Sequence, residues 1–295
     1  MVSQEKENTP EKRPVAGAGK IVLIASGKGG VGKSTVAVNL ACALAGKGIK
    51  TGLLDADLYG PSVHRMMGTS DELRLNAEGN ALPEYSHGVH SLSMGNLTPP
   101  ESPVTWKGAL VAQALLQLFH EVAWPDLNVL VVDLPPGTGD IQLTILEQIP
   151  VSGALVVTTP QELAVADAER AIIMFHDHGV PVFGLVENMN EYICPCCGER
   201  QELFPSGSAG KLAGRHHVAM MPGIPLDPAA QEFADTGEPL VVSAPKNAAA
   251  QVFDELADKL LQALSREEKA EKLRARETAE AAEFWNGLLS GGETP

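Results

Sequence analysis

The stretch IVLIASGKGGVGKST, Ile21–Thr35, is the most specific pattern in this chain of 295 residues. An apolar run typical of a buried strand leads into a glycine-rich turn, and a helical pattern follows it. Gly27, four intervening residues and then Gly32, Lys33 and Ser34 match G-x-x-x-x-G-K-[ST] in the strand-to-helix context that this motif requires. The stretch therefore predicts a nucleotide phosphate site. A glycine-rich turn without a ligand is the alternative.

The chemistry of that loop assigns roles to its residues. Backbone N–H groups of a tight glycine turn converge on phosphate oxygens, aided by the positive end of the following helix. Lys33 is expected to reach the β and γ phosphates, and the Ser34 hydroxyl to coordinate Mg²⁺. ATP and Mg²⁺ are thus the expected cofactors. The residues expected to bind the nucleotide here are Gly27, Lys28, Gly29, Gly30, Val31, Gly32, Lys33, Ser34 and Thr35.

Outward from this loop, short apolar strands alternate with helical patterns. Strands separated by helices of this length need right-handed crossovers, which build a mostly parallel sheet covered on both faces. The fold class is therefore α/β, a doubly wound, mostly parallel sheet of the P-loop NTPase type. The predicted strands are 21–26, 51–55, 129–133, 154–158, 182–187 and 218–221, and the predicted helices are 33–46, 108–122, 161–178 and 247–264.

Composition sets the boundaries of that domain. Residues 1–19 are polar and rich in charge, Pro and Gly, so we expect a disordered tail there. The ATPase domain is expected over 20–264. Residues 265–295 form a charged helical pattern that ends in Gly-Gly and Pro, and we expect a C-terminal helical tail.

Charge and cysteine use restrict the environment and the partners. The net charge of −15 and the pI near 4.9 disfavour non-specific binding to nucleic acid or to an anionic membrane. The sequence shows neither a signal-peptide pattern nor an apolar run long enough to span a bilayer, so we expect a cytoplasmic protein. In a reducing compartment, close cysteines indicate a metal or redox site rather than a disulfide.

Two carboxylate clusters follow predicted strands, where ligands bind in open α/β sheets. Asp55 and Asp57 lie in LLDADLYGPS, whereas Asp133 and Asp140 lie in VLVVDLPPGTGD. The apolar run into Asp133 is a Walker B pattern, whose carboxylate holds a Mg²⁺-bound water. Asp55 or Asp57 would position or deprotonate the attacking water. Turn and helix-cap roles are the alternatives for each aspartate.

The loop contains a second lysine, Lys28, which an ordinary P-loop does not require. The pattern KGGVGKS resembles the deviant Walker A motif of the MinD, ParA, nitrogenase iron protein and Mrp superfamily. The resemblance implies that Lys28 crosses a homodimer interface to the partner's phosphates. It also favours Asp57 for water activation, Asp55 near the metal, and Asn188 of VENMN on the adenine ring. A solvent-facing lysine and a plain turn asparagine are the alternatives.

Three of the four cysteines lie within YICPCCGER, residues 192–200. The C-x-x-C pair Cys194 and Cys197 can hold one metal centre, although such a centre usually needs four protein ligands. Cys42 lies in an apolar run, and the adjacent pair His216 and His217 lacks the spacing of common zinc modules. Two copies of the pair in a homodimer supply four thiolates, the number that a 4Fe-4S cluster requires.

Seven segments together resemble the Mrp/ApbC family of P-loop ATPases over roughly residues 20–264: GKGGVGKST, DADLYGPSVHRMMG, VDLPPGTGDIQLTI, VTTPQELAVADAERAI, VENM, CPCCG and IPLD. The resemblance implies an ATPase that carries a 4Fe-4S cluster and delivers it to apo-proteins. Its cluster-binding segment would be 190–205, with Cys194 and Cys197 as the ligands of a cluster shared between subunits. Cys196 falls at the variable position of the motif. The alternatives for its role are an additional cluster ligand, a thiol that takes part in exchange, and a passive extra thiol.

Two other functions share the same nucleotide site. One is a MinD- or ParA-like positioning ATPase, although residues 266–283 mix glutamates with Lys and Arg where a membrane anchor needs a basic polar face. The other is a P-loop ATPase with a structural zinc at its dimer interface.

Overall fold

The computed structural model describes residues 12–58, 60–70, 72–97, 108–194, 196–205 and 207–290, without the side chains of 108–112 and 283–290. The chain forms two compact units, residues 1–257 and residues 258–295. The first unit contains the sheet and the sites discussed below. The described part of the second is helical, and its residues 265–282 are exposed or half-exposed.

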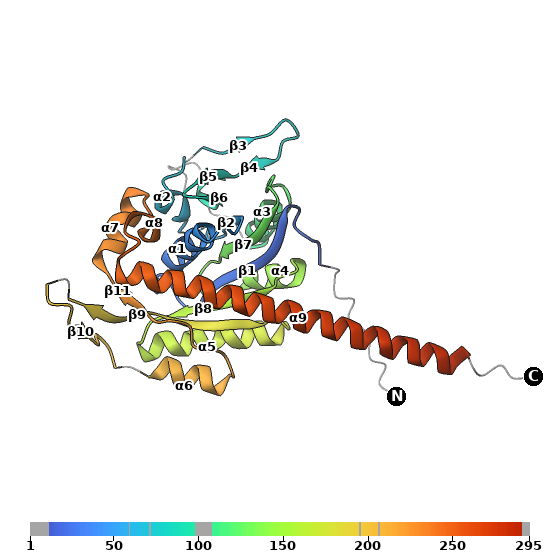
Figure 1. Cartoon of the computed structure of the whole chain (residues 1–295). Helices are drawn as coiled ribbons and strands as arrows, with labels where there is room; N and C mark the ends of the chain where they lie inside the picture. Colours follow the sequence, from blue (N-terminus) through green and yellow to red (C-terminus); the bar gives the residue numbers. More distant parts are fainter. Residues whose placement is uncertain are drawn as a thin grey trace, which may run out of the picture. The chain divides into compact units, whose positions relative to one another are not determined.

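Nine strands of the described residues form one sheet in the order β10-β9-β8-β1-β7-β2-β6-β5, with β11 beside β9 (Figure 1). A separate two-stranded sheet pairs β3 (Arg74–Leu75) with β4 (Ala81–Leu82). The strands of the large sheet are β1 Ala18–Ser26, β2 Thr51–Asp55, β5 Glu84–Ser86, β6 Val89–Ser93, β7 Leu127–Asp133, β8 Gly153–Thr158, β9 Val182–Ile193, β10 Arg200–Gln201 and β11 Ile224–Leu226.

The central strands β9, β8, β1, β7, β2 and β6 pair in parallel, and antiparallel pairs occur at the edges. The predicted α/β class is therefore confirmed. In a parallel sheet the carboxyl ends of neighbouring strands meet at one edge. Here that edge carries Ser26, Asp55, Asp133 and Thr158, with Asp55 directly opposite Asp133 in the register.

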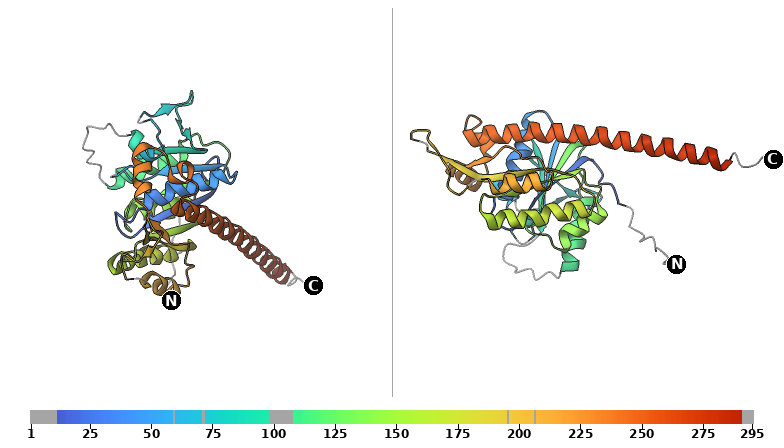
Figure 2. Two further views of the ribbon diagram at one scale, coloured as in Figure 1. Left: turned by 60° about the vertical axis from the view of Figure 1, so that its left-hand side comes forward. Right: turned by 90° about the horizontal axis from the view of Figure 1, so that it is seen from below.

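Helices cover both faces of the sheet, as Figure 2 shows from two further sides. Helices α3, α4, α5 and α6 share one apolar cluster with the sheet, whereas α1 packs against β1, β2 and β7. The helices are α1 Lys33–Gly46, α2 Val63–Met66, α3 Gly108–His120, α4 Asp140–Gln148, α5 Glu162–Asp177, α6 Ser208–Arg215, α7 Pro228–Thr236, α8 Leu240–Ser243, α9 Ala248–Ser290 and the 3₁₀ helix η1 Met94–Leu97.

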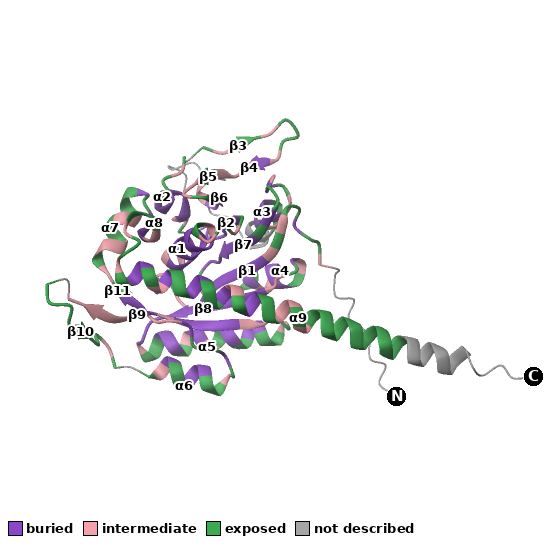
Figure 3. Ribbon diagram, viewed as in Figure 1, coloured by how far each residue is buried: buried purple, intermediate pink, exposed green. Residues whose placement is uncertain are grey.

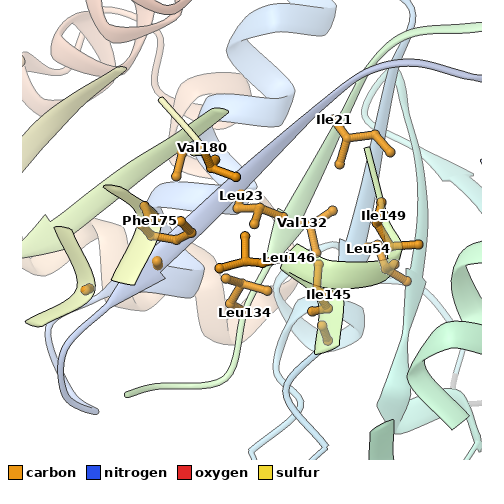
Figure 4. Packing of buried hydrophobic residues seen from close by; sticks show 14 of the residues in the cluster. Ile21, Leu23, Leu54, Val132, Leu134, Ile145, Leu146, Ile149, Phe175 and Val180 are labelled. Atoms are coloured by element: carbon orange, nitrogen blue, oxygen red, sulfur yellow. The ribbon is translucent and has the colours of Figure 1, made fainter. Parts of the chain in front are cut away.

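Residue alternation along β1 fills both layers of the core. Leu23 points into the cluster that contains Ile145 of α4 and Phe175 of α5 (Figure 4). Val22 and Ile24 point to the opposite face by the two-residue period of a strand, and both are fully buried. Figure 3 shows the resulting buried central strands. This two-sided burial explains why the strands appear in the sequence as continuous apolar runs.

Two elements differ from the sequence prediction. The predicted strand 218–221 is wrong, because Met220 forms only an isolated bridge with Leu185 and the strand in this region is β11. Pro222 has no N–H group to continue a ladder, which explains the interruption. Helix α4 was not predicted, although it follows the PPGTGD loop directly.

The boundaries of the ordered chain also differ from the expected ones. Strand β1 begins at Ala18, Val15 is buried, and the Arg13 N–H donates to the Gln148 carbonyl, so order begins before residue 20. Residues 1–11 of the expected tail lie outside the described residues. Helix α9 continues to Ser290, which places the expected boundary at residue 265 inside one helix. None of the described helices is long and apolar enough to cross a membrane.

Candidate functional site

The loop between β1 and α1 lines a cavity of about 510 Å³ at the carboxyl edge of the sheet. Gly30 and Gly32 have φ angles of 80° and 82°, in the left-handed region that favours glycine. Helix α1 begins at Lys33, so its N-terminal N–H groups lie at the cavity. Seven of the nine loop residues predicted to bind the nucleotide line this cavity, and Gly27 and Val31 are not among its lining residues. The seven are Lys28, Gly29, Gly30, Gly32, Lys33, Ser34 and Thr35.

Asp133 holds the two polar side chains that begin α1. The Lys33 ammonium lies 2.5 Å from Asp133 Oδ1, and the Ser34 hydroxyl donates to Oδ2 at 2.6 Å. Asp133 is fully buried. Burial raises the pKa of this carboxyl, against the lowering effect of the Lys33 ammonium. The cation of the loop and the last carboxylate of β7 thus form one hydrogen-bonded unit.

Asp55 organises the segment that follows β2. Its carboxylate accepts hydrogen bonds from the N–H groups of Asp57, Ser62 and Val63 at 3.0, 3.0 and 3.1 Å. The Ser93 hydroxyl donates to it at 2.8 Å. Burial and then the nearby Asp133 charge raise the pKa of Asp55 to about 7. This aspartate therefore caps α2 and fixes the backbone position of Asp57.

Asp57 lines the main cavity and also a neighbouring cavity of about 470 Å³. Its Oδ1 accepts the Gly60 N–H at 3.2 Å. The second cavity also contains Pro135, Pro136 and Asp140 from the loop and helix after β7. Asp57 is therefore shared by the linings of both cavities.

The oxygen groups at this edge match the chemistry of Mg²⁺. Ser34, Asp55 and Asp133 supply hydroxyl and carboxylate oxygens, which Mg²⁺ prefers, and Asp55 and Asp133 are both fully buried. Burial is the main cause of the raised pKa of both carboxyls, and the charge of Asp133 adds to it at Asp55. The residues therefore fit a divalent cation.

Lys28 is half-buried and lines the main cavity. Its ammonium forms no ion pair within the described part of the chain. Its backbone carbonyl accepts a hydrogen bond of 2.9 Å from the Ser26 hydroxyl, which holds the loop near the end of β1. The Lys28 ammonium is therefore available to an anionic group that enters this cavity.

Asn188 lies on the other side of the P-loop, in β9. Its side-chain N–H donates to the Val31 carbonyl at 2.8 Å, and the residue is 6% exposed. A Cβ on Gly32 would lie 2.2 Å from its Nδ2 atom, so the approach of loop and strand requires glycine there. A pocket of about 100 Å³ adjoins Asn188 and includes Thr35, Met189, Pro225, Leu226 and Asp227 among its lining residues.

The cysteines lie in the turn between β9 and β10. The Cys194 N–H donates to the Glu199 carbonyl, and the Gly198 N–H donates to the Cys194 carbonyl. Hydrogen bonds from the backbone N–H groups of Cys197 and Cys196 lower the pKa of the Cys194 thiol. Cys196 and Cys197 are exposed and Cys194 is half-exposed. The turn thus stabilises a thiolate and presents it at the surface.

The other candidate ligands lie elsewhere. Cys42 is buried in α1 with its Sγ 3.9 Å from the Met67 sulfur, and burial raises the pKa of its thiol to about 12. His216 bonds to Glu169 at 2.8 Å. Among the described residues, no group of three or more His, Cys, Asp or Glu side chains is placed to hold a metal ion. One copy of the turn therefore provides an incomplete ligand set.

Two polar residues of the site were not found from the sequence. Ser93 reaches Asp55 from β6, a strand that was not predicted. Gln142 is 2% exposed and bonds to the Gly139 N–H at 3.0 Å and to the Pro135 carbonyl at 2.8 Å, which fixes the loop after Asp133. The sequence signal that could have revealed Gln142 was its position in the first turn of α4, a helix that was not predicted.

Comparisons with known proteins identify relatives of this chain. The ParA family model described as NUBPL iron-transfer P-loop NTPase matches residues 17–261. The chain is 46% identical over 247 residues to the "Iron-sulfur cluster carrier protein" of Salmonella typhimurium, which covers 83% of this chain and 67% of the relative. It is 44% identical over 249 residues to the Arabidopsis thaliana "Iron-sulfur protein required for NADH dehydrogenase, mitochondrial", which covers 84% and 80%.

Solved structures show the same fold. The nucleotide-binding protein of Archaeoglobus fulgidus, in complex with ADP, is 38% identical with a TM-score of 0.66, covering 75% of this chain and 87% of that one. The cell division ATPase MinD of Pyrococcus furiosus is 24% identical with a TM-score of 0.62, covering 83% and 99%, and supports the fold alone. From the extent of the family match and the identity to these relatives, the chain belongs to the NUBPL iron-transfer P-loop NTPase family.

Proposed function

We propose that this protein is an ATP-dependent iron–sulfur cluster carrier. It binds and hydrolyses ATP, holds a 4Fe-4S cluster as cargo at a homodimer interface, and transfers the cluster to apo-proteins. The observation that carries the proposal is the turn at the end of β9, which presents the half-exposed Cys194 and the exposed Cys197 of the C-x-x-C pair. Backbone N–H groups of the same turn lower the pKa of the Cys194 thiol, which favours the thiolate form that binds metals.

The nucleotide half of the mechanism begins with an exchange of partners. Lys33 leaves Asp133 and binds the β and γ phosphates, because the phosphates offer the ammonium a larger negative charge. Ser34 and Asp133 would then hold Mg²⁺, which would supply positive charge to neutralise the phosphate groups. Asp55 stays near the metal and keeps Asp57 in place. Asn188 contacts the adenine ring beside the P-loop.

Hydrolysis uses Asp57 as the proton acceptor. As the water oxygen bonds to the γ phosphorus, the bond from this phosphorus to the β–γ bridging oxygen breaks, and Asp57 takes a water proton. The products are ADP and inorganic phosphate. Lys28 of the partner subunit offsets charge on the transferred group. Asp57→Asn is expected to lower kcat by at least about 100-fold while MgADP binding persists, measured by phosphate release and by calorimetry.

The cluster half requires two copies of the chain. One copy presents Cys194 and Cys197, and no third metal ligand joins them in the described residues. A two-fold axis beside the turn would supply four thiolates. Cargo held in this way is released when the two turns separate, which suits a carrier rather than a resident cofactor.

Anaerobic reconstitution with ferrous iron and sulfide tests the cluster proposal. The wild-type protein is expected to bind about four iron and four sulfide per dimer, the composition of one 4Fe-4S cluster. Cys194→Ala and Cys197→Ala are expected to abolish binding, whereas the matched control Cys196→Ala retains it. The readouts are metal analysis, the visible spectrum and the mass of the particle by light scattering.

Three outcomes would contradict the proposal. A protein that binds no iron, or one whose iron content is unchanged by both the Cys194→Ala and the Cys197→Ala substitutions, would refute the cluster site. A colourless protein with stoichiometric zinc after anaerobic purification would indicate a structural zinc. ATP-dependent flotation with liposomes, without bound iron, would favour a positioning ATPase.

A further inference from the structure

Strand β9 joins the nucleotide site to the cysteine turn. Asn188 of β9 is hydrogen-bonded to the P-loop at Val31, and Cys194 directly follows the last residue of the same strand. Six residues of extended chain at about 3.3 Å each separate these two positions by roughly 20 Å. A change in the conformation of this strand would therefore reach both sites.

The strand is irregular at one residue between the two sites. Met189 has a φ angle of 57°, in the left-handed region that a long side chain seldom adopts. The pairing with β11 shifts at the same place. Ile224 lies opposite Asn188 and Leu226 lies opposite Tyr192, so β9 has more residues than β11 over this stretch. This pattern is a β-bulge, which changes the direction of the strand.

Two buried polar atoms close to Met189 lack a hydrogen-bond partner in the described part of the chain, although the adjacent Asn188 is bonded to Val31. These atoms are Glu187 Oε1 and Asn190 Oδ1. A Cβ on Gly223 would lie 2.4 Å from Asn190 Nδ2, which shows how closely the neighbouring chain packs there. Strained backbone with unsatisfied polar groups persists only where the surroundings impose it. Strain of this kind clusters at switch regions, where a change in the surroundings releases it.

The bulge also lines the pocket beside the P-loop that the proposed function assigns to the base. Asn188 and Met189 both line the pocket of about 100 Å³ beside the P-loop, together with β11 residues that pair with β9. The Met189 methyl group would lie 3.7 Å from a Cβ on Gly32. A base that enters this pocket must contact the strained residue itself.

We propose that Met189 is a positioning residue that couples base binding to the cysteine turn. Contact with the nucleotide base changes the balance between two arrangements of the β9 bulge, and β9 transmits the change to Cys194. This inference rests on the proposed function, because it takes the base pocket and the cysteine turn as the two sites. It adds the physical route by which nucleotide occupancy regulates cluster retention.

The test measures thiol reactivity in the cluster-free protein, so it does not depend on cluster loading. The alkylation rate of Cys194 by iodoacetamide is followed by peptide mass spectrometry, without nucleotide and with saturating MgADP. We expect MgADP to change the wild-type rate at least fivefold. In Met189→Gly, where glycine adopts the left-handed conformation without strain, we expect less than a twofold change. His217→Gly is the matched control, since His217 has a similar φ angle of 55° outside β9.

The outcomes separate this inference from the proposed function. If the wild-type rate does not respond to MgADP, or if Met189→Gly responds as strongly as the wild type, the coupling is refuted even where the cluster binds. If His217→Gly also loses the response, the effect is not specific to β9 and the inference fails. Should Met189→Gly not fold, hydrogen exchange of residues 190–194 in the wild type decides, with unchanged exchange on MgADP binding counting against the route.

Discussion

Gly27→Ala is the sharpest test of how the P-loop is packed in this protein. Gly27 is the first residue after β1, and a Cβ there would lie 2.1 Å from both the carbonyl carbon and the carbonyl oxygen of Asp167, and 2.6 Å from the Ala168 nitrogen. All three atoms belong to the backbone of α5. No side-chain rotation relieves such a clash, so the loop or the helix must move.

The magnitude follows from the required displacement. Ordinary contacts of a Cβ begin at 3.4 Å, so a separation of 2.1 Å requires a shift of about 1.3 Å. Helix α5 resists that shift because Ala168, Ala171 and Ile172 are fully buried in the core. Overpacking of this kind costs about 1–3 kcal/mol, and a clash with backbone belongs at the upper end. For a domain of this size, about 3 kcal/mol lowers Tm by roughly 6–12 °C.

Thermal unfolding of the nucleotide-free protein, followed by circular dichroism, measures this effect. The matched control is Gly29→Ala in the same loop, where the added Cβ would meet only the Pro136 Cγ atom at 4.0 Å. We expect the control to unfold within about 2 °C of the wild type. A Gly27→Ala protein that unfolds within about 2 °C of this control would refute the rigid packing of α5 against the loop.

Three further predictions concern individual side chains. Because burial raises the pKa of Cys42 to about 12, its thiol should react with a maleimide only after unfolding, whereas Cys196 reacts at once; rapid labelling of all four thiols would contradict this. The pKa of Asp55 is about 7 in the folded protein and about 3.9 in the unfolded chain, so protonation of Asp55 stabilises the folded protein. This stabilisation is fully present below about pH 4 and is lost as the pH rises to 7. In EDTA the protein should therefore have a lower Tm at pH 7.5 than at pH 5.5, and Asp55→Asn should reduce the difference; an undiminished difference would exclude Asp55 as its source. Asn188→Ala leaves the Val31 carbonyl without its donor and should weaken binding of a fluorescent ATP analogue about five- to tenfold, a prediction that unchanged affinity would overturn.

Local patterns in the sequence were sufficient to predict the fold class and the position of the P-loop. The strand, glycine turn and helix around Lys33 follow one another in the chain, so their spacing alone shows the motif. The short edge strands β5 and β6 carry weaker periodicity and were not predicted, and Ser93 was missed with them. Gln142 was missed because its partners Pro135 and Gly139 are backbone groups of a loop whose shape the sequence does not state.

The alternation of strands and helices, the glycine loop and the spacing of Cys194 and Cys197 are visible in the sequence, since each depends on residues close together in the chain. That Asp55 faces Asp133 is visible only in the folded protein, because this register depends on pairing between strands far apart in sequence. Tertiary pairing with β11 likewise reveals the bulge at Met189 within β9. Long-range strand pairing, rather than local propensity, therefore sets which charges meet at the edge of the sheet and how the two candidate sites are joined.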